Sequence, residues 1–423
     1  MTTNMNILFR RMYRAKCDGI LRYIKQFFVP VLFILFIIGC EQNEGIDPMQ
    51  QSERLELNND EIDLNRDVVE KNDTIEIRNE AGFPGGRIAS TFDLVLVTEI
   101  PSPSVDGDLL QSTAVNLTCE KAIVSFNVQG DTYKGGIKVL NIEDNIKVTS
   151  YLQFKDADIH NVHFSEKEVY AATGTSNKVD DQTAVLEIFT LDGDKLNIEN
   201  SSRIGLGSYA ANCVIASEKS IYVTTGDNEN SGGGIYKIGM DNRQIEASMD
   251  LHDARWVDIC NQDLFVVQGT PGKYSVLDPD LSNLKNGISV KGMNIPESKS
   301  TIEIHGNMAF IAAGSAGVQI FNIVTSQLIG EIPVPDNTNN PDVLTNAVSY
   351  DNCLLFISNG AGGVYVAKVL TDVNKNATSC ETELLGYLDF DSLASVNHIA
   401  FKGKYLFVAA GLEGIKIVKV IRN

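Results

Sequence analysis

The stretch FIAAGSAGVQIFNI, residues 310–323, decides the fold of this chain. An aromatic residue and three small or β-branched residues lead to Gly314, and a short turn with a second glycine, Gly317, leads into the alternating segment VQIFNI. Glycine supplies the positive φ angles that a tight reversal between two strands requires. The stretch therefore predicts two antiparallel strands joined by a short turn.

The aromatic-to-glycine pattern recurs along the chain, and a recurring pattern reveals the architecture before any single motif does. The seven copies are FNVQG (126–130), YAATG (170–174), YVTTG (222–226), FVVQG (265–269), FIAAG (310–314), FISNG (356–360) and FVAAG (407–411). Successive closing glycines lie 44, 52, 43, 45, 46 and 51 residues apart. This period is typical of the blades of a β-propeller.

Each copy has the same surroundings. An apolar stretch with a polar turn precedes it, as in VHFSEKEVY or IAFKGKYLF, and a strand such as GVQIFNI or GIKIVKV follows. A fourth strand comes next, as in SYLQF or LIGEIPV. Each unit thus supplies four short antiparallel strands, and we expect an all-β, seven-bladed β-propeller over residues 87–423.

The sequence also predicts how the ring closes. LVTEIPSPS (96–104) resembles LIGEIPVPD (328–336), the fourth strand of the fifth unit, and the chain stops at Asn423 just after the third strand of the seventh. We therefore expect an N-terminal strand to complete the seventh blade, because this pairing leaves no sheet edge open.

The repeats resemble the LVIVD-repeat family of bacterial surface proteins. FIAAGSAGVQIFNI (310–323) and FVAAGLEGIKIVKV (407–420) carry the resemblance best, and it covers roughly residues 95–423. The family pattern continues into an Asp-Ile-Ser stretch, whereas this chain has FNIVTS and VKVIRN, so its repeats are degenerate. The resemblance implies a propeller on the bacterial surface and, since the family has no general assigned chemistry, little about activity.

Residues 1–39 have the pattern of a lipoprotein signal peptide. Several Arg and Lys residues precede an apolar run, residues 27–38, that is too short to span a bilayer but typical of a signal-peptide core. The run ends in IIGC (37–40), which resembles the bacterial lipobox and implies lipidation of Cys40. We expect a lipid-anchored protein of the bacterial envelope, in the outer membrane or at the cell surface. A signal anchor with a chance cysteine is the alternative.

Residues 40–86 are polar and acidic, with NNDEIDLNRD and EKNDTIEIRNE in quick succession. Such a stretch buries too little apolar surface to offset the entropy lost on ordering. It predicts a flexible acidic tether, with a short strand possible at 74–78. The whole chain has a formal charge of −20, which disfavours nucleic acid as a partner.

Polar side chains recur 13 or 14 residues before the marker glycines, where inner strands should begin. This polar ring comprises His160, Asn161, Asn212, Arg255, Trp256, Asn346, Asn397 and His398, with Cys213, Ser300 and Thr301 at equivalent offsets. One interpretation is that these side chains bond backbone groups at strand starts. The other is a ligand site in the channel mouth, with Trp256 as a stacking surface and Arg255 for an anionic group.

Two further features carry weaker predictions. Asp227, Glu229 and Ser231 have the spacing of an EF-hand-like calcium loop, but the downstream bidentate carboxylate is missing, so an ordinary polar loop is the alternative. Ca²⁺ is thus a possible ligand and no cofactor is required. After residue 40 the cysteines are Cys119, Cys213, Cys260, Cys353 and Cys380, and the pair Cys353 and Cys380 is the candidate disulfide.

Two classes of function fit these observations. The first is a binding or interaction module displayed on the envelope, with an envelope protein or glycan as ligand. The second is a metal-dependent hydrolase or lyase of the propeller type, with His160 or His398 as the base. No nucleophile with a placed base is recognisable, so no catalytic residue is assigned.

Overall fold

The computed structural model describes residues 53–78, 92–228, 231–295, 298–335, 340–390 and 395–422. The predicted signal peptide, Cys40 and Glu229 lie outside the described residues. Among the helices that the structure does describe, none has the length and apolar character needed to cross a membrane.

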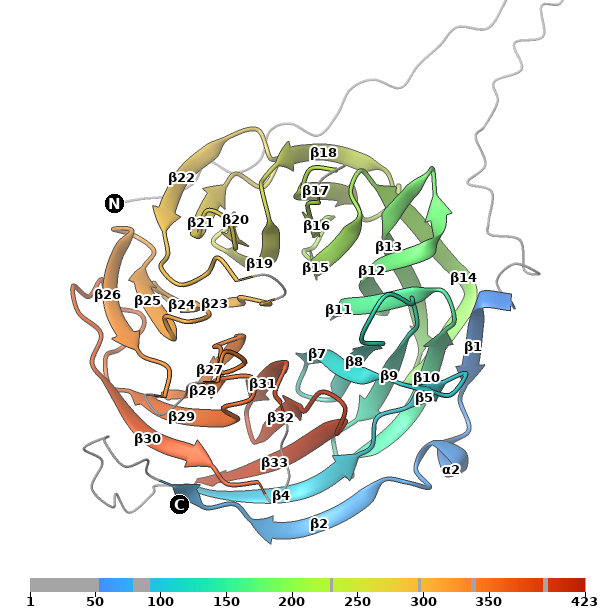
Figure 1. Cartoon of the computed structure of the whole chain (residues 1–423), viewed down its shortest axis with the longest axis horizontal. Helices are drawn as coiled ribbons and strands as arrows, with labels where there is room; N and C mark the ends of the chain where they lie inside the picture. The colour runs from blue at the N-terminus through green and yellow to red at the C-terminus, as the bar shows by residue number, and fades with distance from the viewer. Residues whose placement is uncertain are drawn as a thin grey trace, which may run out of the picture. The chain divides into compact units, whose positions relative to one another are not determined.

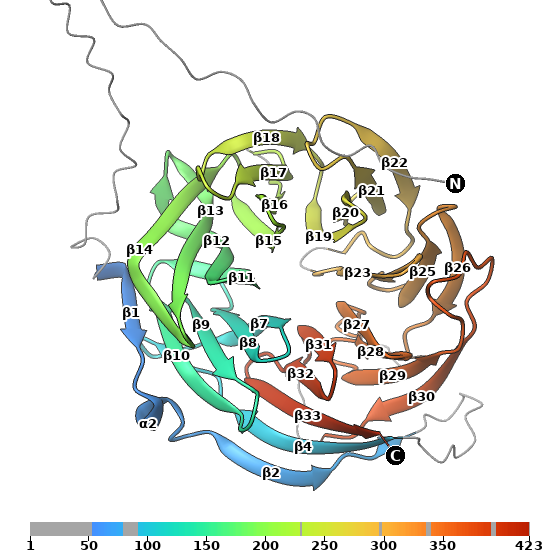
Figure 2. The ribbon, with the colours of Figure 1, turned by 180° about the vertical axis from the view of Figure 1, so that it is seen from behind.

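Seven antiparallel sheets of four or five strands form the blades of a ring, as predicted (Figure 1; Figure 2 shows the ring from behind). From the channel outward, blades 1 to 4 consist of β7 (Gln111–Leu117), β8 (Lys121–Asn127), β9 (Gly135–Asn141) and β10 (Lys147–Phe154); β11 (Ala157–Ser165), β12 (Glu168–Val179), β13 (Gln182–Asp192) and β14 (Lys195–Leu206); β15 (Ala210–Ala216), β16 (Ser220–Gly226), β17 (Gly234–Gly239) and β18 (Ile245–Asp250); and β19 (Ala254–Cys260), β20 (Asp263–Gln268), β21 (Lys273–Leu277) and β22 (Leu284–Ser289).

Blades 5 to 7 follow the same plan. They consist of β23 (Ile302–His305), β24 (Met308–Ala312), β25 (Val318–Asn322) and β26 (Gln327–Ile332); β27 (Ala347–Asp351), β28 (Leu354–Ser358), β29 (Val364–Val369) and β30 (Thr382–Leu388); and β31 (His398–Lys402), β32 (Tyr405–Ala409), β33 (Ile415–Arg422) and β4 (Phe92–Ile100). Before blade 1 the chain makes a small hairpin of β5 (Ser104–Val105) and β6 (Asp108–Leu109).

The repeat marks the second strand of each blade. Its aromatic residue is buried in all seven copies, from Phe126, which is 0% exposed, to Phe265, which is 4% exposed. The buried apolar residues form seven clusters, and each cluster joins two neighbouring blades. The core is therefore distributed between blades, and each blade depends on both of its neighbours for burial.

The glycine argument holds where the turns are tightest. Gly314 and Gly317 have φ angles of 54° and 78°, and the equivalent pairs in the sixth and seventh repeats also have positive φ. A Cβ on Gly317 would come within 2.1 Å of the carbonyl oxygen of Ile332. Glycine is therefore required there both for its backbone conformation and for the close approach of the next segment.

The predicted closure is confirmed. β4 pairs antiparallel with β33, from Phe92 opposite Arg422 to Ile100 opposite Ile415. The Lys416 ammonium, on a side chain only 5% exposed, forms an ion pair of 2.7 Å with Glu99 across this ladder. The pairing joins the start and the end of the propeller and leaves the third strand of blade 7 without an open edge.

The expectation of a flexible tether is wrong for residues 53–78, which we call the strap. Its segments β1 (Leu55–Asn58), β2 (Val69–Thr74) and β3 (Ile77–Arg78) add a fifth strand to blades 1, 7 and 6, and α2 (Glu61–Leu64) lies between the first two. β1 pairs with β10, β2 with β4 and β3 with β30, so the strap follows the outer rim of three blades (Figure 1).

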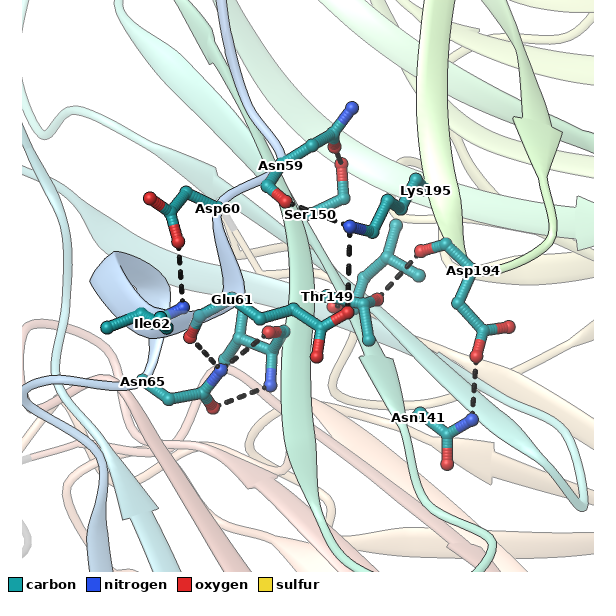
Figure 3. A network of polar contacts seen from close by, with 12 residues as sticks. Asn59, Asp60, Glu61, Ile62, Asn65, Asn141, Thr149, Ser150, Asp194 and Lys195 are labelled. Atoms are coloured by element: carbon teal, nitrogen blue, oxygen red, sulfur yellow. Dashed lines mark hydrogen bonds and ion pairs between the residues drawn. The ribbon is translucent and has the colours of Figure 1, made fainter.

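Polar side chains of the strap bond directly to the blades (Figure 3). Asn65 donates to the carbonyl of Val148 at 2.8 Å and accepts the backbone N–H of the same residue at 2.9 Å. Asn59 accepts from Ser150 at 2.6 Å and donates to the carbonyl of Leu196 at 3.2 Å. These amides have specific partners in the fold, although the composition of the segment indicated a solvated chain.

Arg54 fixes the start of the strap at the junction of blades 1 and 2. Its guanidinium is 4% exposed and contacts Glu187 at 2.6 Å and Asp156 at 2.8 Å. Glu187 is fully buried and also pairs with Arg203 at 2.8 Å. Charged residues that composition assigns to solvent are therefore neutralised inside the fold, and backbone pairing with open blade edges offsets the ordering entropy.

The proposed disulfide is also wrong, since Cys353 and Cys380 are free cysteines. Cys353 is exposed in the hairpin between β27 and β28. Cys380 donates its backbone N–H to the carbonyl of Ile329 in blade 5 and lies against Gly330. Both cysteines belong to the sixth repeat, but the second is held by the neighbouring blade.

Two deletions that retain Cys40 should separate closure from the strap. Removing residues 41–91 deletes the strap but keeps the ring closed, so the thermal midpoint should fall by several degrees and the protein should stay monomeric. Removing residues 41–100 also deletes β4, so unpaired backbone groups of β33 should be exposed and the protein should aggregate. Thermal unfolding and size-exclusion chromatography measure both effects. A monomeric 41–100 deletion with an unchanged midpoint would contradict closure by β4.

Candidate functional site

A cavity of about 1260 Å³ lies at the end of the channel where the loops between second and third strands emerge. We call it the bowl. Six members of the polar ring line it: His160, Asn212, Arg255, Trp256, Asn346 and Asn397. Asn161 and His398 instead line a smaller cavity of about 320 Å³ toward the other end of the channel, which Trp256 also reaches. The ring predicted from the repeat offsets is therefore divided between two cavities.

β-Bulges aim several of these side chains. The pairing of first and second strands skips one residue in each of blades 1 to 4, at Thr113, His160, Asn212 and Arg255. All four residues line the bowl. A bulge inserts an extra residue and redirects its side chain, so the same irregularity in four blades builds much of the bowl wall.

Two contacts cross the channel and separate the cavities. Lys299, in the loop between blades 4 and 5, donates from Nζ to the carbonyl of His160 in blade 2 at 3.1 Å. The ring of Trp256 in blade 4 stacks on His398 in blade 7, with centroids 5.2 Å apart. In each case the two blades face each other across the ring (Figure 1). These contacts form the floor of the bowl.

A belt of hydrogen bonds joins the innermost strands all the way round. At every junction, a side chain of one blade bonds a backbone group of the next blade along the chain. The seven bonds are Asn116 with Phe164 N, Asn161 with Val214 N, Asn212 with Ala254 O, Asp258 with Ile304 N, Glu303 with Tyr350 N, Ser349 with Phe401 N, and His398 with Val115 N.

The belt gives a structural role to several ring residues. Each innermost strand is a sheet edge, and its unpaired backbone groups must find partners when they are buried. Asn161, Asn212 and His398 supply such partners, and Asn397 does the same by donating to the carbonyl of Ser112 at 2.9 Å. The backbone-bonding interpretation thus describes their contacts, although the partners lie in the next blade and not in their own strand.

Arg255 already has partners for its charge. Its guanidinium is held by Asp253 through bonds of 2.7 and 2.9 Å and donates to the carbonyl of Ser298 at 2.9 Å. The side chain is 8% exposed, and its guanidinium occupies the space where a Cβ on Gly269 would lie. The interactions of this arginine are therefore internal to the wall of the bowl.

Lys299 is the cation that the sequence argument missed. It precedes Ser300, a position counted as equivalent to the ring, but no repeat offset selects it. Its ammonium lies at the floor of the bowl, where burial lowers the pKa to about 8. Burial also lowers the pKa of His160 to about 4 and that of His398 to about 3, so both imidazoles are neutral at neutral pH.

The wall also holds carboxylates. Burial raises the pKa of Asp158 to about 7, although this residue accepts backbone N–H bonds from Val128 and Lys134. Asp131 is exposed at the rim. The bowl thus combines a cationic floor with carboxylates nearer its mouth.

The candidate calcium loop does not converge where the structure describes it. Asp227 bonds the imidazole of His252 and accepts the backbone N–H of Asp253, whereas the hydroxyl of Ser231 bonds Asn228 at 3.0 Å. Within the described ranges, no three His, Cys, Asp or Glu side chains are grouped so as to hold a metal ion. Calcium binding remains a prediction.

Comparison with known proteins gives no family. No protein-family model matches the sequence, and no curated protein shows significant similarity to it. Among solved structures, the computationally designed Ika8 protein is 12% identical, with a TM-score of 0.47 over 83% of this chain and 100% of that chain. The resemblance to the LVIVD repeats therefore remains a prediction from the sequence.

The belt makes a quantitative prediction. Asn161→Ala leaves the buried N–H of Val214 without its acceptor and should lower the free energy of unfolding by about 1–3 kcal/mol. Ser349→Ala should act similarly through Phe401, and the two losses should add because blades 2 and 6 are not neighbours. Denaturant unfolding measures both, with Asn286→Ala on the exposed β22 as the control. A loss no larger than that of the control would show that the belt bonds are dispensable.

Proposed function

We propose that this protein is a binding module held on the bacterial envelope by a lipid on Cys40, with its ligand in the bowl. The observation that carries the proposal is the bowl itself, a cavity of about 1260 Å³ closed at its floor by the two cross-channel contacts. Ligand sites are typically concave and combine apolar or aromatic walls with a few polar groups. The bowl fits this description, with Trp256, Tyr133 and Tyr209 among its lining residues.

The strap supports a close attachment to the membrane. If Cys40 carries the lipid, only residues 41–53 separate the anchor from Arg54, which is fixed at the junction of blades 1 and 2. Fully extended, that segment reaches at most about 50 Å. A tether through residue 86 would reach about three times as far, so the strap keeps the propeller near the membrane and sets the edge from which it is held.

The anchor is tested by Cys40→Ser in the full chain expressed in a bacterial host. Because no other residue supplies the thiol at the cleavage site, the variant should move from the detergent phase to the aqueous phase on detergent partitioning. Metabolic labelling with a fatty acid should mark the wild type alone. Cys119→Ser is the control and should leave both readouts unchanged. Labelling of the Cys40 variant would refute the anchor.

The binding site is tested by filling the bowl. A Cβ on Gly174 would lie 3.4 Å or more from its nearest neighbours, which include His160 and Tyr133, so Gly174→Phe projects a ring into the cavity without a backbone clash. Thermal shift with a panel of envelope glycans and short peptides should find a ligand for the wild type and none for the variant. Gly287→Phe, where open space surrounds the added atoms on β22, is the control. A ligand that still binds after Gly174→Phe would place the site elsewhere.

A further inference from the structure

The floor of the bowl carries a charge that the described residues do not balance. The Lys299 ammonium has three N–H donors, and the bond to the carbonyl of His160 uses one of them. Across the described ranges, no Asp or Glu forms an ion pair with it. The neighbouring imidazoles of His160 and His398 are neutral, and Arg255 is already paired with Asp253.

We propose that the bowl binds its ligand through a carboxylate group that pairs with Lys299. This inference rests on the proposed function and specifies the chemistry of its ligand. An ammonium enclosed by protein is costly when unpaired, and a carboxylate with good hydrogen-bond geometry offsets that cost. Two free donors on Nζ match the acceptor oxygens of one carboxylate.

The walls indicate what else the ligand carries. Trp256 presents a half-buried ring beside the lysine, and Tyr209, which is 41% exposed, stands nearer the mouth. Such surfaces contact the face of a sugar ring or an apolar side chain. The body of the ligand therefore contacts aromatic walls while its carboxylate reaches the floor.

The rim excludes highly charged anions. Asp131 is exposed at the mouth and Asp158 lies in the wall, within a chain whose formal charge is −20. A polyanion would place its further charges against these carboxylates, and such repulsion is strong at distances below about 8 Å at physiological salt. The bowl is thus suited to a single carboxylate on a neutral or cationic body.

Two sources of this chemistry can be distinguished with matched probes. Calorimetry on the full chain should compare D-glucuronate with methyl D-glucoside, and trialanine free acid with trialanine amide. The free acid of one pair should bind about tenfold tighter than its uncharged partner, or more, as expected for a charge-assisted bond. The pair that responds tells whether the source is an acidic sugar or a peptide C-terminus. Heparin, a polyanion, should bind no tighter than the free acid.

The charge itself is tested by Lys299→Met, which keeps most of the side-chain volume. The preference for the free acid should disappear, while the thermal midpoint should stay the same or rise because an unbalanced charge has been removed. Lys138→Met is the matched control. Lys138 is also a buried lysine with a pKa lowered to about 8 and a backbone carbonyl acceptor, but it lies in β9 outside the bowl.

Three results would overturn the inference. The first is a preference for the free acid that survives Lys299→Met, and the second is equal binding of acid and neutral probes. The third is no binding of either free acid at millimolar concentration. Glu297→Gln should leave the preference intact, since that neighbouring carboxylate, which lies outside the described residues, should not be the partner of Lys299. Each result leaves the proposed function standing, because Gly174→Phe tests the bowl with ligands of any charge.

Discussion

The antiparallel pairing of β4 with β33 is the interaction on which the rest of the structure depends. The core is divided into seven clusters, each shared by two neighbouring blades, so a blade is fully buried only when both neighbours are present. An open ring would expose one apolar face at each end. Closure by a strand from the start of the propeller removes both exposed faces and joins residues more than 300 positions apart.

The same constraint acts at the outer and the inner edges of the blades. On the outside, the strap covers the edges of blades 1, 6 and 7 with β1, β3 and β2. On the inside, the innermost strands cannot pair with one another across the channel, so their backbone groups are satisfied by side chains from the preceding blade. The strap and the belt are two solutions to the problem of unpaired strand edges.

This explains why a conspicuous polar ring is a poor guide to a binding site. Asn161, Asn212 and His398 recur at equivalent offsets because every junction needs a backbone partner there. Lys299 answers no such need, since its loop precedes β23 and its ammonium crosses the channel to a blade three positions away. In a repeat protein, the residue that departs from the repeat is the better candidate for function, because the recurring positions are occupied by the requirements of packing.

The sequence by itself determined the fold class, the number of blades, the four strands of each and the closing strand, because these follow from a local pattern repeated seven times and from one strand left over at each end. Only the tertiary structure decided the strap, since the acidic composition of residues 53–78 conceals that Arg54, Asn59 and Asn65 have partners between 80 and 140 positions away. It also decided which polar groups are consumed by the fold and which remain. A side chain's partners across the channel depend on blade geometry that no spacing along one chain encodes, so the paired Arg255 and the unbalanced Lys299 could be told apart only in the folded ring.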